Sequence, residues 1–186
     1  VEPFRMLDIC LESDGACAVL VTAAARARDL AQRPVYILGG AYGGGPNQGD
    51  DLFDALRWPD HAHNYSRYIA ADLWRSAGVE PGDVDVAEIY DCFTYSVLMQ
   101  LEGFGFCGEG EGGPFVQDGR IARDGALPVN THGGLLSEAY IHGLNHVLEA
   151  VRQLRGAAGA RQVPGAEIAF TGAGAMTCGS AMVLRR

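Results

Sequence analysis

The sequence predicts an α/β protein, and three observations support this. Residues 144–154 carry apolar side chains at steps of three and four, the pattern of a helix that packs one face on a sheet. Short apolar runs at 84–89 and 167–171, bounded by turn residues, are typical of buried strands. The chain has 186 residues, 26 of them glycine, and is 48% hydrophobic, which suits a sizeable core with many turns.

The first elements expected along the chain are a strand, a helix and a second strand. Residues 13–21 start with a turn and continue as small apolar residues, which predicts a buried strand. Residues 23–32 are rich in alanine and arginine and predict a helix. Residues 35–40 predict a short buried strand. The glycine-rich residues 41–46 then predict an irregular loop at the strand end, where Tyr42 could contact a ligand.

The middle of the chain predicts two helices around a buried strand. Residues 66–77 predict a helix that ends at the glycine and proline turn of 78–82. The strand at 84–89 leads into a helix around 96–103. Many glycines and several acids at 103–125 favour a long surface loop or lid.

Polar residues gather at 130–143, just before the amphipathic helix. Gly133 and Gly134 allow backbone to approach a ligand closely, and free N–H groups at a helix start favour a negative or partly negative oxygen. This segment is therefore a plausible site of chemistry. After the helix, the strand at 167–171, a glycine turn at 172–174 and a closing strand complete the chain.

Composition excludes several classes of function. The net charge of −9 disfavours nucleic acid and anionic membranes as partners. All 14 basic residues are arginine, so a Schiff-base lysine, a P-loop lysine and pyridoxal chemistry cannot reside in this chain. The five scattered cysteines predict neither a disulfide framework nor a zinc site. No long apolar run or signal pattern occurs, so we expect a cytoplasmic protein.

Two histidine pairs have spacings that could suit a metal ion. His61 and His63 flank one residue, and His142 and His146 lie four apart on the predicted helix. Neither pair has an acidic or cysteine ligand at a supporting spacing, and no HExxH pattern is present. The sequence therefore predicts no metal site.

The segment at 130–143 resembles the C-terminal half of the thiolase superfamily. Asn130, Gly133 and Gly134 match the Asn-x-x-Gly-Gly run of that family. Tyr140 falls where thiolases carry a catalytic histidine, and Ile141 replaces the proline that follows it.

A second motif resembles the sterol-carrier-protein-X type of thiolase, in which a strand ends in His-Asp-Cys-Phe. Asp91, Cys92 and Phe93 match this motif, and Tyr90 replaces the residue that opens it. Matching 172–174 to the glycines after the family's C-terminal catalytic cysteine places Phe170 at the cysteine position.

The resemblance implies a thiolase-like fold, the C-terminal half of an αβαβα layered sandwich with a mixed sheet covered by helices. It assigns residues 1–22 to the end of an N-terminal thiolase-like half and 23–186 to the C-terminal domain. The half that carries the family's nucleophilic cysteine would lie outside this chain. One half alone would expose a sheet face and edge, so we expect this chain to need a companion. The resemblance also implies a thiolase-type homodimer.

The substitutions disfavour thiolase chemistry and favour an aldolase. Tyrosine can exchange protons, as retro-aldol cleavage of a 3-hydroxyacyl-CoA requires. The pattern resembles the lipid-transfer-protein aldolases of bacterial steroid degradation, which implies a zinc-ribbon/OB-fold partner protein and no cofactor beyond the substrate's coenzyme A. It implies Tyr90 and Tyr140 as the acid/base pair, without deciding which is the base. Supporting roles fall to Asp91 and His132 as hydrogen-bonding residues, to Gly133 and Gly134 as oxyanion donors, and to Tyr42 and Cys92 at the substrate.

Two alternatives remain open from the sequence. One is an acyl-CoA thiolase or acetyltransferase of the sterol-carrier-protein-X type whose nucleophile lies in an N-terminal half. The other is a non-catalytic, thiolase-like subunit that binds lipid or stabilises an active partner. Thiolysis with free coenzyme A would indicate the first, and ligand binding without turnover the second.

Overall fold

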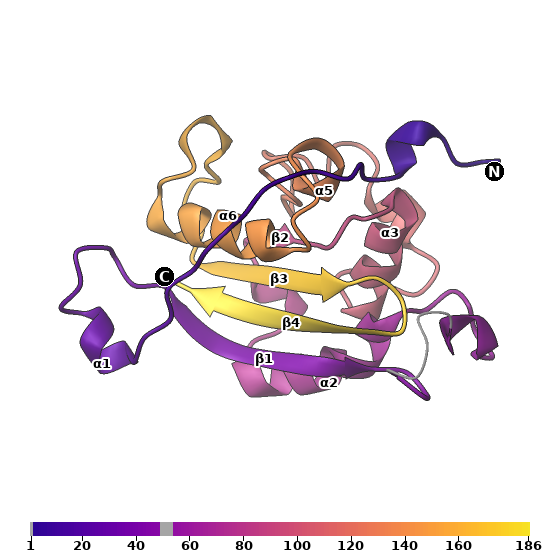
Figure 1. The fold of residues 1–186 in the computed structure, drawn as a ribbon, viewed down its shortest axis with the longest axis horizontal. Helices are drawn as coiled ribbons and strands as arrows, with labels where there is room; N and C mark the ends of the chain where they lie inside the picture. Colours follow the sequence, from indigo (N-terminus) through magenta and orange to yellow (C-terminus); the bar gives the residue numbers. More distant parts are fainter. Residues whose placement is uncertain (1, 49–53) are drawn as a thin grey trace.

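The computed structural model describes residues 2–48 and 54–186, which form a mixed sheet flanked by helices (Figure 1). The strands are β1 (Tyr36–Gly44), β2 (Val86–Glu88), β3 (Ile168–Gly174) and β4 (Cys178–Arg185). The α-helices are α1 (Ala24–Ala27), α2 (Tyr65–Ala77), α3 (Thr94–Gly103), α4 (Gly112–Phe115), α5 (Gly134–Ser137) and α6 (Leu144–Arg155). Single 3-10 turns are η1 (Met6–Asp8), η2 (Asp54–Arg57), η3 (Pro81–Asp83) and η4 (Gly159–Arg161).

The four strands of the described residues lie in the order β1-β4-β3-β2. β3 and β4 form an antiparallel hairpin, and β1 pairs antiparallel with β4. β2 pairs parallel with β3, with Ala87 opposite Phe170. The sheet is therefore mixed, as the sequence analysis predicted.

Helices cover the two faces of this sheet unequally. α2 and α3 pack on one face, where Ile69, Leu73 and Leu101 join Phe170 and Val183 in the main core. On the other face, α6 contributes Ala150 and Leu154 to a second core with residues of β2, β3 and β4. α6 lies over β3 and β2, and no helix of the described residues packs over β1 on that side (Figure 1).

The three long helices begin and end close to where the sequence predicted. α2 starts at Asn64, whose side chain accepts the Ser66 N–H, and ends at Gly78 in the left-handed conformation. α6 ends in the same way at Gly156. The helices predicted from apolar periodicity and turn residues are thus confirmed. The predicted helix at 23–32 is only partly confirmed, because α1 is a single turn.

The predicted buried strand at 13–21 is wrong. No strand forms at 13–21, and its apolar side chains are largely exposed, with Leu20 at 87% and Val21 at 72%. The segment runs across the sheet-and-helix layers without joining the sheet (Figure 1). A small apolar run predicts a strand only where a neighbouring strand offers hydrogen bonds, and the described residues offer none here.

The predicted irregular loop at 41–46 is also wrong, because β1 continues to Gly44 and pairs with β4 through Cys178. The glycines serve close packing instead of flexibility. A Cβ on Gly44 would lie 1.9 Å from the Thr177 carbonyl oxygen, and one on Gly45 would meet the Trp58 indole. The predicted turn at 172–174 belongs to β3 for a similar reason, since a Cβ on Gly174 would lie 2.5 Å from the Gly179 Cα.

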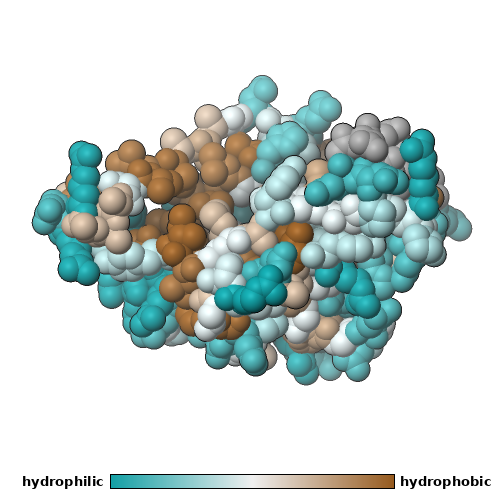
Figure 2. Space-filling model, turned by 90° about the horizontal axis from the view of Figure 1, so that it is seen from below, coloured by the Kyte–Doolittle hydropathy of each residue, from teal (hydrophilic) through white to brown (hydrophobic). Residues whose placement is uncertain are grey.

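Apolar side chains gather around a hollow on one side of the molecule (Figure 2). The exposed large apolar residues come mainly from the N-terminal segment, and include Met6, Leu7, Leu11, Leu20 and Val21. None of the helices in the described residues is long and apolar enough to cross a bilayer.

Candidate active site

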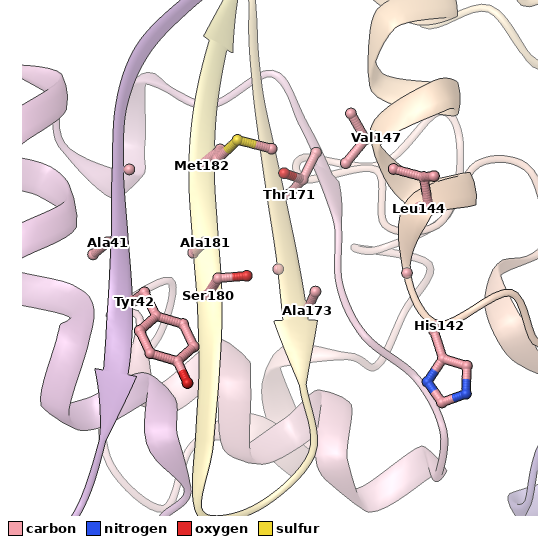
Figure 3. A pocket seen from close by; sticks show the side chains of 13 residues that line it. Ala41, Tyr42, His142, Leu144, Val147, Thr171, Ala173, Ser180, Ala181 and Met182 are labelled. Atoms are coloured by element: carbon pink, nitrogen blue, oxygen red, sulfur yellow. The ribbon is translucent and has the colours of Figure 1, made fainter. Parts of the chain in front are cut away.

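A cavity of about 540 Å³ lies between the uncovered face of the sheet and the start of α6 (Figure 3). Small residues of β1, β3 and β4 line it, among them Ala41, Ala173 and Ala181, together with His142 and Leu144 on the opposite wall. Tyr42 also lines it from β1 and is 77% exposed. Tyr42 therefore lines a cavity from a strand and not from the predicted loop, and its contact with a ligand stays a prediction.

The two tyrosines predicted as a pair are in contact. Their hydroxyl groups share a hydrogen bond of 2.9 Å, and their rings meet edge to face. Tyr90 follows β2 and is buried, whereas Tyr140 comes from the loop between α5 and α6. A Cβ on the cavity residue Gly143 would lie 3.2 Å from the Tyr90 ring and 3.1 Å from the Ala173 Cβ, so Tyr90 lies directly behind the cavity wall.

The surroundings of Tyr90 keep its hydroxyl proton in place. Burial raises the pKa of Tyr90, and the hydrogen bond with Tyr140 raises it further. Burial also raises the pKa of the Cys92 thiol to about 11, so Cys92 is a thiol at neutral pH. Cys92 lies in the same apolar cluster as the tyrosines, where it packs as a small side chain.

Asp91 connects the tyrosine strand to α5. Its carboxylate accepts the Leu135 N–H at 2.7 Å and the Leu136 N–H at 3.4 Å, which are free donors of the first turn of α5. His146 of α6 lies 3.5 Å from the same carboxylate. Asp91 thus fixes the start of the segment that leads to Tyr140, as expected for a supporting residue.

Gly134 allows the Asp91 carboxylate to approach the start of α5, in addition to any role in ligand approach. It has φ +65°, and a Cβ there would lie 2.0 Å from an Asp91 carboxylate oxygen. Gly133 has φ +104°, and its N–H donates to the Asn130 carbonyl oxygen at 2.8 Å. The Gly133 N–H predicted as an oxyanion donor is therefore committed within its own turn in this structure.

Replacing Gly134 by alanine should destabilise the protein by about 2–4 kcal/mol, because the side chain adds left-handed strain and displaces the Asp91 carboxylate from the Leu135 N–H. Urea unfolding of the full-length protein measures this loss. Gly113→Ala is the matched control, since nothing lies within 4 Å of its Cβ position. Equal stability of both variants would show that Asp91 does not hold α5.

His132 is buried against a carboxylate. Its Nδ1 lies 2.9 Å from an oxygen of Glu88, which ends β2, and both side chains are almost completely buried. Burial alone would lower the pKa of His132, but Glu88 beside it raises the pKa above its usual value. Burial raises the pKa of Glu88 despite this partner.

A metal ion is chemically compatible with part of this cluster. Glu88, His132 and His146 bring ligand atoms within 4.8 Å of one another, as do Asp60, His63 and Glu109 at the surface. His142 is exposed and does not join His146. The sequence pairs His61/His63 and His142/His146 are thus not the groupings that the fold produces among the described residues.

A second buried carboxylate lies behind the first. The Thr131 hydroxyl oxygen lies 3.0 Å from a carboxylate oxygen of Glu88 and 2.9 Å from one of Glu149, so its single O–H can donate to either. Burial alone would raise the pKa of Glu149, but Arg161 donates two hydrogen bonds to it and keeps the pKa below its usual value. This network joins the 130–132 turn to α6.

Sequence reasoning missed Glu88, His142 and Asn145. Asn145 donates to the Ala139 carbonyl oxygen and to Glu138, both at 3.2 Å, and so holds the backbone just before Tyr140. The predicted strand at 84–89 contains two charged residues, Asp85 and Glu88, and nothing in the sequence singled out Glu88. His142 was visible only as half of a metal pair, and Asn145 carried no signal at all.

Comparisons with known proteins agree with this architecture. The Thiolase C-terminal domain-like family model matches residues 54–186. A 17-hydroxy-3-oxo-4-pregnene-20-carboxyl-CoA lyase of Mycobacterium tuberculosis is 46% identical over 183 residues, which is 98% of this chain and 47% of that protein. A steroid side-chain-cleaving aldolase of Thermomonospora curvata is 44% identical over 156 residues, or 84% of this chain and 40% of that protein.

A solved structure gives the same result. The structure described as "Ltp2-ChsH2(DUF35) aldolase" superposes with a TM-score of 0.94 at 39% identity, and covers 100% of this chain and 48% of the matched chain. This chain therefore spans about half the length of the relatives it matches. The resemblance seen in the sequence is confirmed: the chain belongs to the Thiolase C-terminal domain-like family.

Proposed function

We propose that the full-length protein cleaves the side chain of a steroid 3-hydroxyacyl-CoA by a retro-aldol reaction, giving a ketosteroid and a short acyl-CoA. The observation that carries this is the 2.9 Å hydrogen bond between the Tyr90 and Tyr140 hydroxyl groups beside a cavity. The reaction needs one group to take the substrate's hydroxyl proton and one to protonate the thioester enolate. A bonded tyrosine pair supplies both operations. The names of the lyase and aldolase relatives support this choice.

The remaining side chains divide between support and contact with substrate. Asp91 and His132 hold the segments that carry the two tyrosines, through the start of α5 and through Glu88. Tyr42 and Cys92 are the proposed substrate contacts, with the Gly134 N–H as the remaining oxyanion donor of the glycine pair. The reaction requires no cofactor beyond the coenzyme A of the substrate.

The proposed assembly is a hetero-oligomer with a DUF35-type partner, a zinc-ribbon/OB-fold protein, built on a thiolase-type homodimer. The solved aldolase that matches this chain was described together with a DUF35 protein, which supports the partner.

Thiolysis is the second candidate, and the structure disfavours it within this chain. Phe170 stands where the family carries its C-terminal catalytic cysteine, is fully buried, and packs on the core side of β3. The side chains of Thr171 and Ala173, one and three residues further along β3, line the cavity. Alternation along the strand therefore points residue 170 away from the cavity.

A coupled assay separates the candidates. The full-length protein and its DUF35-type partner are incubated with a steroid 3-hydroxyacyl-CoA, with and without free coenzyme A, and the products are identified by mass spectrometry. We expect a ketone and a shortened acyl-CoA in both tubes. Cleavage only with free coenzyme A would indicate a thiolase, and unchanged substrate in both tubes a binding subunit.

A further inference from the structure

We propose that His142 receives and returns the proton of Tyr140, and so acts as the proton store of the tyrosine pair. The proposal deepens the retro-aldol function above and rests on it. Three independent features of the structure point to it: a contact, a strained backbone and a place on the cavity wall.

The first feature is the contact between His142 and Tyr140. His142 Nδ1 lies 3.5 Å from the Tyr140 hydroxyl oxygen, and the two rings overlap with centroids 4.6 Å apart. The same hydroxyl group lies 2.9 Å from that of Tyr90. The three side chains therefore form one continuous line from the buried end of β2 to the cavity. Such contacts are often long before a substrate binds.

The second feature is the backbone conformation of His142 and Gly143. His142 has φ 48° and Gly143 has φ 84°, so two consecutive residues adopt the left-handed conformation. A side chain other than glycine is uncommon there, and it persists only where the surrounding structure holds it. With this backbone conformation the Tyr140 and His142 rings, two residues apart, meet at an interplanar angle of 40°. Strain of this kind concentrates at functional sites.

The position of His142 gives it access that the other histidines near the pair lack. His142 is exposed and lines the cavity (Figure 3), whereas His146 is completely buried and the His132 side chain is 1% exposed. His132 and His146 also face the carboxylates of Glu88 and Asp91. His142 is therefore the histidine that can exchange protons between the tyrosines and the cavity.

The proposed retro-aldol reaction needs a group that accepts a proton from the tyrosine pair and returns it. Burial raises the pKa of Tyr90, so Tyr90 does not readily give up its proton unless it regains one from a neighbour. An imidazole is the side chain most often used for proton transfer near neutral pH, and the cation it forms would stabilise an adjacent tyrosinate.

The proposed reaction neither gains nor loses a proton overall, so it needs no proton donor beyond the substrate and these three side chains. Tyr140 passes its proton to His142 Nδ1 as it takes the hydroxyl proton of the substrate. The resulting alkoxide breaks the Cα–Cβ bond and gives a ketone and a thioester enolate. Tyr90 then protonates the enolate carbon and regains a proton from Tyr140, which regains its own from His142. The site ends as it began.

Two variants at His142 test the proposal in the full-length protein with its partner and a steroid 3-hydroxyacyl-CoA. Glycine and asparagine both tolerate φ near 48°, so neither should disturb the loop. Asparagine fills the space but cannot take a proton, whereas glycine leaves a gap open to the cavity. We expect kcat to fall about 10²-fold or more in both, with a smaller change in KM.

Added imidazole is the decisive probe. It should raise kcat of His142→Gly by about tenfold or more and leave His142→Asn unchanged. His61→Asn, at an exposed histidine that does not line the cavity, should match the wild type with and without imidazole. The proposal would be overturned if His142→Gly had the same kcat as the wild type, or if imidazole did not raise the kcat of His142→Gly. A wild-type protein that does not cleave substrate would instead remove the proposed function, and this inference with it.

Discussion

Tyr140→Phe and Tyr90→Phe are each expected to lower kcat for steroid side-chain cleavage by about 10²–10⁴-fold, the usual contribution of a positioned acid or base. The two hydroxyl groups share one 2.9 Å hydrogen bond, so they act as a unit. The double variant should therefore be little slower than the worse single variant, because losses within one catalytic unit do not add. Steady-state kinetics of the four proteins measures this directly.

The fold should survive these changes. Phenylalanine keeps each ring in its apolar cluster and removes one hydroxyl from a pair, so circular dichroism and urea unfolding should change little. Tyr68→Phe is the matched control, since Tyr68 is 44% exposed and contacts the Trp58 ring away from the pair. Fully additive losses would mean that the two tyrosines act in separate steps without exchanging a proton.

Phe170→Ala should cost about 3–5 kcal/mol of stability, the range for removing a fully buried aromatic side chain. The Phe170 ring is at the centre of the main core, with ring contacts to Trp74, Phe104 and Phe106 at centroid distances of 5.9, 4.7 and 5.3 Å. Three aromatic neighbours cannot all move inward to fill the gap, so a cavity remains. Urea unfolding of the full-length protein, followed by tryptophan fluorescence, measures the loss.

The same position also tests the thiolase alternative. Phe170→Cys places a thiol where the family carries its catalytic cysteine, but on the core side of the sheet. We expect a destabilised protein without thiolysis activity. Leu56→Ala, at a residue 65% exposed, is the control and should change stability by about 0.5 kcal/mol or less. A loss below about 1 kcal/mol for Phe170→Ala would contradict the packing described here.

The sequence predicted those parts of the fold in which local pattern and tertiary packing agree. α2 and α6 combine apolar periodicity with glycine at their ends, and both appeared where expected. In β1, local propensity and tertiary packing disagree. Glycine is a poor strand residue by propensity, yet Gly44 lies in β1, where a Cβ would overlap the Thr177 carbonyl oxygen and crowd the Cys178 Cα of β4. That constraint comes from distant residues and leaves no local signal.

The site was predictable to the extent that it follows family motifs. Tyr90 and Tyr140 lie 50 residues apart, and their contact follows from two motif positions that the thiolase fold brings together. Glu88 and Asn145 could not be found in this way, because a buried charged or amide side chain has the same letter as an exposed one. Only the folded loop at 131–139 shows what they contact, because it supplies the partners of both.

Most residues in the sheet wall of the cavity are small, although Tyr42 and Met182 also line it; the small ones include Gly40, Ala41, Gly172, Ala173 and Ala181. Side chains of this size have few ways to vary without closing the space, so this wall has little freedom to change during evolution. The opposite wall of the cavity, and any element that lies over β1, have much more freedom to change. Divergence in substrate shape would therefore accumulate on the covering elements, while the sheet and the tyrosine pair behind it keep the chemistry constant.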